Sequence, residues 1–250
     1  MTLRISTLSE RPDFSADLWD LRAQVPDFMG QDPVADLYFM DVEEIHRDYV
    51  LVAWEHSAPD RLIARGFSVP FARAEGDPLE FLPDDGWDGV IRQGYSDRKS
   101  GRTPDAVSVL EITVDRRHRG RGVSVAMVEA MRANSRAKGF TDLFAPVRPN
   151  AKHEVPLMSM QEYLRVKTPE GLPADPWLRV HCRMGAHVVK VAPRSMTVTG
   201  TCAEWRRWTG LPFDRTGPVV VPEALAAVHC FHEQDWAVYV EPNVWVHHTL

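Results

Sequence analysis

The segment from Val107 to Lys138 constrains the fold most, because a strand, a turn and a helix follow one another in it. Both faces of residues 107–114 are mostly apolar, which is typical of a central strand covered on both sides. Regular alternation places Ser108, Leu110, Ile112 and Val114 on one face and Val107, Val109, Glu111 and Thr113 on the other. Residues 123–138 have apolar residues at helical spacing, and Gly139 is placed to end that helix. This order indicates an α/β domain.

The junction between strand and helix has the sequence Arg-Arg-His-Arg-Gly-Arg-Gly over residues 116–122. Gly120 and Gly122 allow the backbone to approach an anion, and the N–H groups that open the helix point at it. The arginines add positive potential. The junction therefore predicts a phosphate-binding cradle, with a solvated basic turn as the alternative. It is not a dinucleotide fingerprint, because Val125 stands where the third glycine belongs.

The composition argues against a nucleic acid as the partner of this basic turn. Lys and Arg number 29 and Asp and Glu 35, so the net charge of −6 repels phosphate backbones. We expect no membrane partner, since no apolar run approaches the roughly 18 residues that span a bilayer. The three cysteines are far apart, no signal peptide is evident, and no metal-ligand spacing occurs. These features predict a cytoplasmic protein without a disulfide scaffold or a metal site.

Further elements are expected on both sides of this segment. Before it, the patterns predict a strand over 3–7, helices over 18–25 and 33–47, a strand pair over 49–54 and 61–71, and a short helix over 87–95. After it, they predict a strand over 143–147, a helix over 175–185 with Asp175 as N-cap, strands over 187–191, 196–201 and 236–247, and a helical turn over 204–210.

With these elements in place, the sequence resembles the GNAT superfamily of acyl-CoA-dependent N-acetyltransferases. The family signature, Arg/Gln-x-x-Gly-x-Gly/Ala after an apolar strand and at a helix start, matches residues 117–122. The order of elements is similar over roughly residues 3–200. The resemblance implies an α/β fold with a GNAT-type mixed central sheet flanked by helices. We expect a core over 1–200 with substrate-side insertions at about 74–106 and 151–175, and a C-terminal extension over 201–250 packed on the same domain.

The resemblance also implies acetyl-CoA, or another acyl-CoA, as co-substrate, and no metal. The backbone of the signature would bind the pyrophosphate. The strand over 112–114 would bind the pantetheine arm in a wedge opened beside residues 143–147, and an Asn after that second strand is common in the family. The residues assigned to the cofactor in this way are Ile112, Thr113, Val114, Arg117, Arg119, Gly120, Arg121, Gly122, Val123, Ser124 and Asn150.

Three residues are candidates for proton transfer. Glu111 is a carboxylate in an apolar strand, where loss of solvation makes a better base, and the alternative is a structural carboxylate paired with an arginine. His181 stands in the place of the tyrosine of a Tyr-x-x-x-Gly run that protonates the leaving thiolate in the family. His181 is therefore a candidate acid, with an ordinary helix histidine as the alternative. Tyr163 is a second candidate for the acid.

The segments that exceed a minimal GNAT core contain many aromatic and acidic residues. An aromatic wall with carboxylates suits a small organic amine, and Trp87, Tyr163 and Trp177 are the candidates for binding it. We therefore expect direct acetyl transfer from acetyl-CoA to the amine of a small molecule, without a covalent enzyme intermediate. The alternatives are an acyl-CoA-binding protein that transfers nothing and an acetyltransferase acting on a protein amine. The sequence leaves a homodimer open.

Overall fold

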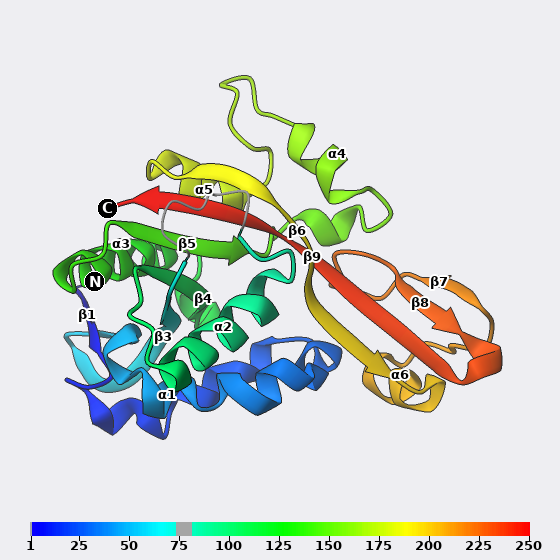
Figure 1. Ribbon diagram of the computed structural model, residues 1–250, viewed down its shortest axis with the longest axis horizontal. Coiled ribbons are helices and arrows are strands. Elements are labelled where there is room, and N and C mark those ends of the chain that lie inside the picture. Colours follow the sequence, from blue (N-terminus) through cyan, green and yellow to red (C-terminus); the bar gives the residue numbers. More distant parts are fainter. Residues whose placement is uncertain (1, 74–81) are drawn as a thin grey trace.

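The structure is a computed structural model that describes residues 2–73 and 82–250. Within these residues nine strands form one sheet in the order β1-β2-β3-β4-β5-β9-β8-β7, and β6 pairs with β9 outside this path (Figure 1). The strands are β1 (Leu3–Thr7), β2 (Val50–Glu55), β3 (Ala58–Phe71), β4 (Ala106–Val114), β5 (Asp142–Val147), β6 (His187–Gly200), β7 (Gly217–Val219), β8 (Val228–Phe231) and β9 (Trp236–Thr249). Only β4 and β5 are parallel among the pairs of this sheet in the described residues.

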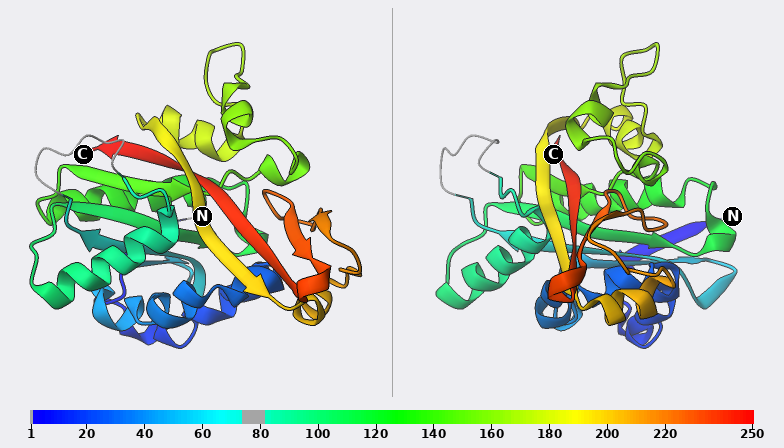
Figure 2. Two further views of the ribbon diagram at one scale, coloured as in Figure 1. Left: turned by 45° about the vertical axis from the view of Figure 1, so that its right-hand side comes forward. Right: turned by 90° about the vertical axis from the view of Figure 1, so that its right-hand side faces the viewer.

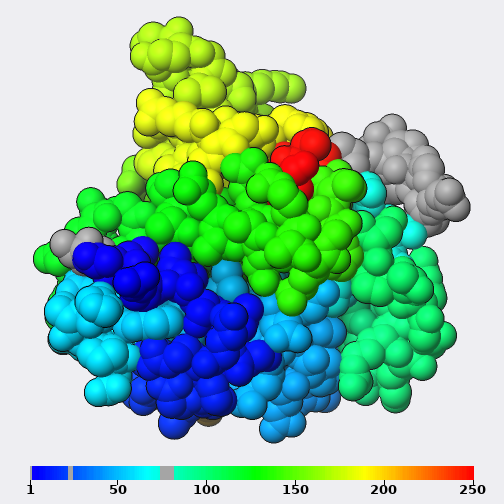
Figure 3. All heavy atoms as spheres, turned by 90° about the vertical axis from the view of Figure 1, so that its left-hand side faces the viewer, coloured from blue at the N-terminus to red at the C-terminus, as the bar shows by residue number. Residues whose placement is uncertain are grey.

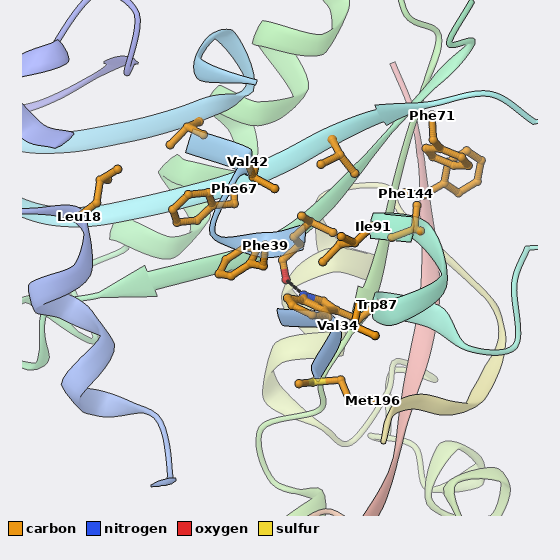
Figure 4. Close-up of a cluster of buried hydrophobic side chains, with 14 of the residues drawn as sticks. Leu18, Val34, Phe39, Val42, Phe67, Phe71, Trp87, Ile91, Phe144 and Met196 are labelled. Atoms are coloured by element: carbon orange, nitrogen blue, oxygen red, sulfur yellow. Dashed lines mark hydrogen bonds between the residues drawn. The ribbon is translucent and has the colours of Figure 1, made fainter. Parts of the chain in front are cut away.

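Helices cover both faces of the sheet. They are α1 (Val42–Ile45), α2 (Gly86–Ser100), α3 (Val123–Ala137), α4 (Met160–Arg165), α5 (Pro176–Arg183) and α6 (Cys202–Thr209). On one face, Met127 of α3 and Leu178 of α5 belong to one buried cluster. On the other face, Phe39 of the N-terminal segment and Trp87 of α2 pack near Phe67 of β3 (Figure 4). This mixed sheet flanked by helices confirms the predicted fold class.

The strands β6 and β9 form a long ribbon that extends beyond the strands β1 to β5 (Figures 1 and 2). Its far end packs with α6, β7 and β8 around the fully buried Trp205 and around Tyr239. Its near end completes the central sheet, because β9 pairs with β5. The paired residues run from Asp142 opposite Thr249 to Val147 opposite Val244. The segment expected as an extension from residue 201 therefore supplies a strand beside β5. Figure 3 shows the end of β9 between the green segment of α3 and β5 and the yellow segment of α5 and β6.

A β-bulge interrupts β4 at Leu110. Glu111 is opposite Phe67 of β3 and Val109 is opposite Ser68, which leaves Leu110 as an extra residue without a cross-strand partner in β3. A bulge of this kind bends the strand and shifts the direction of the side chains that follow it.

The bulge makes the predicted alternation of β4 wrong. Val109 packs in the cluster beneath α3, and beyond the bulge Ile112 and Val114 pack in that same cluster. Leu110 lies in the opposite cluster, with Trp87 and Phe39. Because one extra residue exchanges the two faces, Glu111 is directed away from α3 and toward the N-terminal segment.

The segment predicted as a helix over 33–47 is helical in parts but does not form one regular helix. The chain forms one wide π-helical turn over Ala35–Phe39, and then the short helix α1. Phe39 is buried there, whereas Leu37 and Met40 are 66% and 37% exposed. The apolar side chains of this segment thus do not share the face of one regular helix.

The two strands predicted at 187–191 and 196–201 form the single strand β6, whose register shifts between Ala192 and Met196. The first predicted insertion contains α2, while its residues 74–81 lie outside the described residues. In the described part of the chain, no helix is both long and apolar enough to cross a bilayer.

Two buried carboxyl groups, Asp32 and Asp88, join the N-terminal segment to α2. Asp32 is fully buried, and Asp88 is 5% exposed. Burial, together with the neighbouring Asp32, raises the pKa of Asp88 to about 9, so Asp88 is protonated at neutral pH. A protonated carboxyl group can donate to a carboxylate, so the two groups pack without two adjacent negative charges.

We expect this pair to make stability depend on pH. The folded protein holds a proton that the unfolded chain releases above the ordinary aspartate pKa of about 4. The free energy of unfolding therefore falls as the pH rises from there toward the folded pKa of Asp88. Asp88→Asn removes this contribution because an amide does not ionise, and the variant should exceed the wild type in stability at alkaline pH. Urea unfolding at several pH values measures the effect, with the exposed Asp41→Asn as control. An unchanged pH dependence in Asp88→Asn would contradict it.

Candidate active site

The parallel strands β4 and β5 separate soon after they meet. They pair only at Val107–Leu143 and Ser108–Phe144, and both strands continue beyond these pairs. The space between them opens into a cleft of about 700 Å³. Residues of β4, β5, β9, α2, α5, the start of α3 and the N-terminal segment line this cleft. This volume is in the usual range for small-molecule sites, and the wedge implied by the resemblance is present.

The turn Arg116–Gly122 forms one end of the cleft. Gly120 and Gly122 have φ values of 73° and 79°, a left-handed conformation that favours glycine. Gly122 is the N-cap of α3, and no side chain in the described residues caps this helix. The first N–H groups of α3 are therefore available to an anion, with the positive end of the helix dipole behind them. The arrangement has the geometry of a phosphate cradle.

Most residues assigned to the cofactor from the sequence line the cleft, namely Ile112, Thr113, Val114, Arg119, Gly120, Val123, Ser124 and Asn150. Arg117, Arg121 and Gly122 are not among its lining residues. The guanidinium of Arg117 is 2.6 Å from the carboxylate of Asp115 and is 68% exposed, and Arg121 is also exposed. Asp115 thus neutralises Arg117, and Arg121 adds positive potential near the cradle without lining the cleft.

Glu111 lines the cleft and is paired with a buried arginine. Arg65 Nε donates to Glu111 Oε1 at 2.9 Å, and the hydroxyl of Thr113 donates to the same oxygen at 2.6 Å. Arg65 is 1% exposed, and its guanidinium lies 5.0 Å from the ring centroid of Trp19. The structural pairing considered from the sequence is thus present. These contacts all involve Oε1, so Oε2 remains available in the described structure to bind an ammonium group or accept its proton.

His181 of α5 also lines the cleft and is 2% exposed. Its Nδ1 lies 3.0 Å from Nε2 of His248, and its own Nε2 has no hydrogen-bond partner among the described residues. Burial lowers the pKa of His181 to about 4, so the ring is neutral at neutral pH. An imidazolium acid is therefore not the resting state of this residue.

Tyr163 lies outside the cleft lining. Its hydroxyl donates to Asp175 Oδ2 at 2.8 Å, and Oδ1 of Asp175 caps α5 by accepting from the N–H of Trp177 and of Leu178. Burial and the bond to Asp175 raise the pKa of the Tyr163 hydroxyl, which makes it a weaker acid. These contacts suit a residue that fixes the start of α5.

The two tryptophans predicted to bind the acceptor both line the cleft. The indole N–H of Trp87 donates to the carbonyl of Leu110 at 3.0 Å, and Figure 4 shows the ring beside Phe39. Trp87 is 8% exposed. It therefore packs behind the bulge of β4, to which its N–H is bonded, and also forms part of the cleft wall. Trp177 packs edge-on against His181, with ring centroids 4.7 Å apart.

A polar cluster in the cleft was not predicted from the sequence. Glu241 of β9 is fully buried and accepts from Arg148 Nε at 3.0 Å and from the Tyr239 hydroxyl at 2.8 Å. Asn243 is bonded to Ser195 Oγ at 2.9 Å. Arg148, Glu241 and Asn243 all line the cleft. The sequence does contain a sign of this cluster, because Tyr239, Glu241 and Asn243 are polar residues at every second position of β9. In the described residues no group of three or more potential ligand side chains is placed to hold a metal ion.

Comparisons with known proteins bear on this site. No protein-family model matches the chain. The arginine N-acetyltransferase avaD of Aspergillus versicolor is 30% identical over 275 residues, which covers 98% of this chain and 93% of that protein. The loading GNATL domain of CurA from Lyngbya majuscula is 15% identical with a TM-score of 0.57, and the match covers 99% of this chain and 96% of that one. The GphF GNAT-like decarboxylase in complex with isobutyryl-CoA is 13% identical with a TM-score of 0.50, over 100% and 99% of the two chains.

The parallel strands β4 and β5 separate beside the turn that opens α3, and the curated relative extends over nearly the whole chain. The chain belongs to the GNAT superfamily. It is an N-acetyltransferase.

Proposed function

We propose that the chain transfers the acetyl group of acetyl-CoA to the amine of a small cationic molecule in the cytoplasm, with arginine as the first candidate. The observation on which this rests is the position of Glu111 at the bulge of β4, inside a cleft that has an anion cradle at one end. The name of the curated relative, an arginine N-acetyltransferase, supports the choice of acceptor.

The cofactor is proposed to lie along the wedge. The backbone from Arg119 to Ser124 holds the pyrophosphate, since these N–H groups open α3. Main-chain groups of Ile112–Val114 bind the pantetheine arm along the free edge of β4, and Asn150 binds it from beyond β5. The thioester is then placed close to the bulge, beside Glu111.

In the proposed reaction, Oε2 of Glu111 accepts a proton from the ammonium group of the acceptor. The free amine attacks the thioester carbonyl, backbone N–H groups of β4 stabilise the oxyanion, and the C–N bond forms. The C–S bond then breaks, CoA leaves as the thiolate, and the nitrogen releases its second proton to solvent as the amide forms. The enzyme forms no covalent intermediate.

The acceptor is proposed to lie between Trp87, Trp177 and the polar cluster. Glu241 is neutralised by Arg148, whereas the carboxylate of Glu223, which also lines the cleft, has no ion-pair partner among the described residues. Glu223 is therefore proposed to bind the cationic group of the acceptor, which suits a guanidinium because that group is planar and has several donors.

The direct test measures CoA release from acetyl-CoA with arginine, agmatine, lysine and a set of peptides, and identifies the acetylated nitrogen of each product. We expect turnover with small cationic amines. Turnover with peptides alone would favour a protein acceptor. Acetyl-CoA binding without transfer to any amine would favour the non-catalytic alternative.

Replacing Glu223 by Gln should raise the KM for arginine roughly tenfold while the KM for acetyl-CoA stays unchanged, because one charge-assisted hydrogen bond is lost. Glu233→Gln makes the same change at an exposed site outside the cleft lining and serves as the control. Equal arginine KM values in the two variants would remove Glu223 from the acceptor site.

A further inference from the structure

Two buried histidines from distant parts of the chain are joined at the edge of the cleft. His181 of α5 and His248 of β9 are 2% and 1% exposed, and Nδ1 of the first lies 3.0 Å from Nε2 of the second. Their other ring nitrogens, His181 Nε2 and His248 Nδ1, have no partner within the described residues. Of the two, only His181 lines the cleft.

This bond fixes the tautomers of both rings together, because each neutral imidazole has one N–H and one lone pair. In one arrangement His181 Nδ1 donates, which leaves a lone pair on His181 Nε2 and an unpartnered N–H on His248 Nδ1. In the other, His248 Nε2 donates, which leaves an N–H on His181 Nε2 and a lone pair on His248 Nδ1.

Two physical effects favour the second arrangement. Only His181 lines the cleft, so a ligand can accept from an N–H on its Nε2, whereas an N–H on Nδ1 of His248 would stay buried without a partner. In addition, burial disfavours a positive charge on His248, as do its neighbours His181, Arg132, His247 and His187, of which Arg132 on α3 carries a fixed positive charge. Nε2 of His248 is already bonded to His181, so the charge of Arg132 acts on the other ring nitrogen, Nδ1. A nearby cation favours a lone pair over an N–H at that nitrogen.

We propose that His248 is a positioning residue that holds His181 in the tautomer with its Nε2–H available to the sulfur of the acyl-CoA thioester. This inference rests on the proposed function. When the C–S bond breaks, its electron pair stays on sulfur, and the Nε2–H hydrogen-bonds to the thiolate. His181 keeps its proton, and the thiolate is protonated by water after release. The acceptor nitrogen loses two protons, one from the ammonium group to Glu111 and one to solvent as the amide forms, so the step balances without an imidazolium.

The arrangement predicts a pH profile that differs from that of an imidazolium acid. An imidazolium would be lost as the pH rises through the ordinary histidine pKa of about 6.5, and the rate would fall with it. A neutral imidazole donor does not lose its proton in this pH range, so kcat should not decline as the pH rises through about 6.5.

The first experiment determines the tautomer without measuring activity. Nitrogen chemical shifts of isotope-labelled histidine, assigned with His181→Gln and His248→Gln, distinguish protonated from unprotonated ring nitrogens in the wild-type protein. We expect a protonated Nε2 and an unprotonated Nδ1 in His181 at neutral and alkaline pH. An unprotonated Nε2, or titration of His181 near the ordinary histidine pKa, overturns the proposal. This result stands even if no acceptor amine is found.

The second experiment measures kcat. His248→Phe should lower kcat roughly tenfold, with the KM values for acetyl-CoA and acceptor little changed, because the donor to His181 Nδ1 is lost. His248→Gln should recover part of the loss, since its amide can donate to the same nitrogen. His229→Phe, at an exposed histidine of β8 outside the cleft lining, is the control. A kcat within twofold of the wild type in both His248 variants overturns the positioning role.

Discussion

Replacing Glu111 by Gln is expected to lower kcat by roughly 10²–10³-fold, with little change in the affinity for acetyl-CoA. The amide keeps an oxygen that can accept the bonds from Arg65 and Thr113, so the local geometry is retained. It has no charge with which to take a proton from an ammonium group. The loss should therefore appear in kcat and not in cofactor binding, as steady-state kinetics with acetyl-CoA and arginine will measure.

Two measurements separate this effect from damage to the fold. Arg65 is buried, and the Gln variant leaves its charge without a counter-ion, so the free energy of unfolding must be measured for the same variant. Glu129→Gln, at an exposed position of α3, makes the same chemical change away from the cleft. If Glu111→Gln stays within about threefold of the wild-type kcat, Glu111 serves only to hold Arg65.

Replacing Gly122 by Val is expected to weaken acetyl-CoA binding by about 100-fold or more and to abolish the increase in Tm that acetyl-CoA gives the wild type. Gly122 has φ 79° at the N-cap of α3, and a β-branched residue avoids this conformation. The turn must then change, and the N–H groups that open α3 are no longer aligned on one anion. Thermal shift and calorimetric titration with acetyl-CoA, and with pantetheine lacking the phosphates, measure the effect.

Gly101→Val is the matched control for this substitution. Gly101 has φ 69° at the C-cap of α2, and a Cβ at either glycine would meet no atom within 4 Å. Both variants therefore contain the same backbone strain, but only Gly122 opens α3. Gly101→Val should lower Tm and retain the acetyl-CoA response. Equal loss of the response in both variants would indicate general destabilisation, and its retention in Gly122→Val would contradict the cradle.

The sequence predicted the turn before α3 and the cap of α5 because their chemistry is local. The signature turn lies between one strand and one helix, and Asp175 caps α5 as predicted, with its Oδ1 2.9 Å from two N–H groups. Features of this kind depend on residues a few positions apart, so periodicity and turn chemistry are enough to find them.

The surroundings of Glu111 could not be predicted in the same way. Alternation placed its side chain on the face with Val109, and the bulge at Leu110 exchanged the faces and turned it toward Arg65. A bulge adds one residue without an unusual sequence, so only the pairing with β3 reveals it. The contact of His181 with His248 depends on β9 lying beside β5, which no local pattern determines.

The separation of β4 and β5 has a consequence for the solution behaviour of this protein. Past Ser108 and Phe144 the two facing strand edges have no ladder partner in the described chain, although their other edges pair with β3 and β9. Unpaired strand edges are templates for adding a foreign strand, and this is a common route to aggregation. A pantetheine arm has amide groups that can pair with such edges. Saturation with acetyl-CoA is therefore expected to act as a kind of edge protection, which slows aggregation on storage and on refolding from urea.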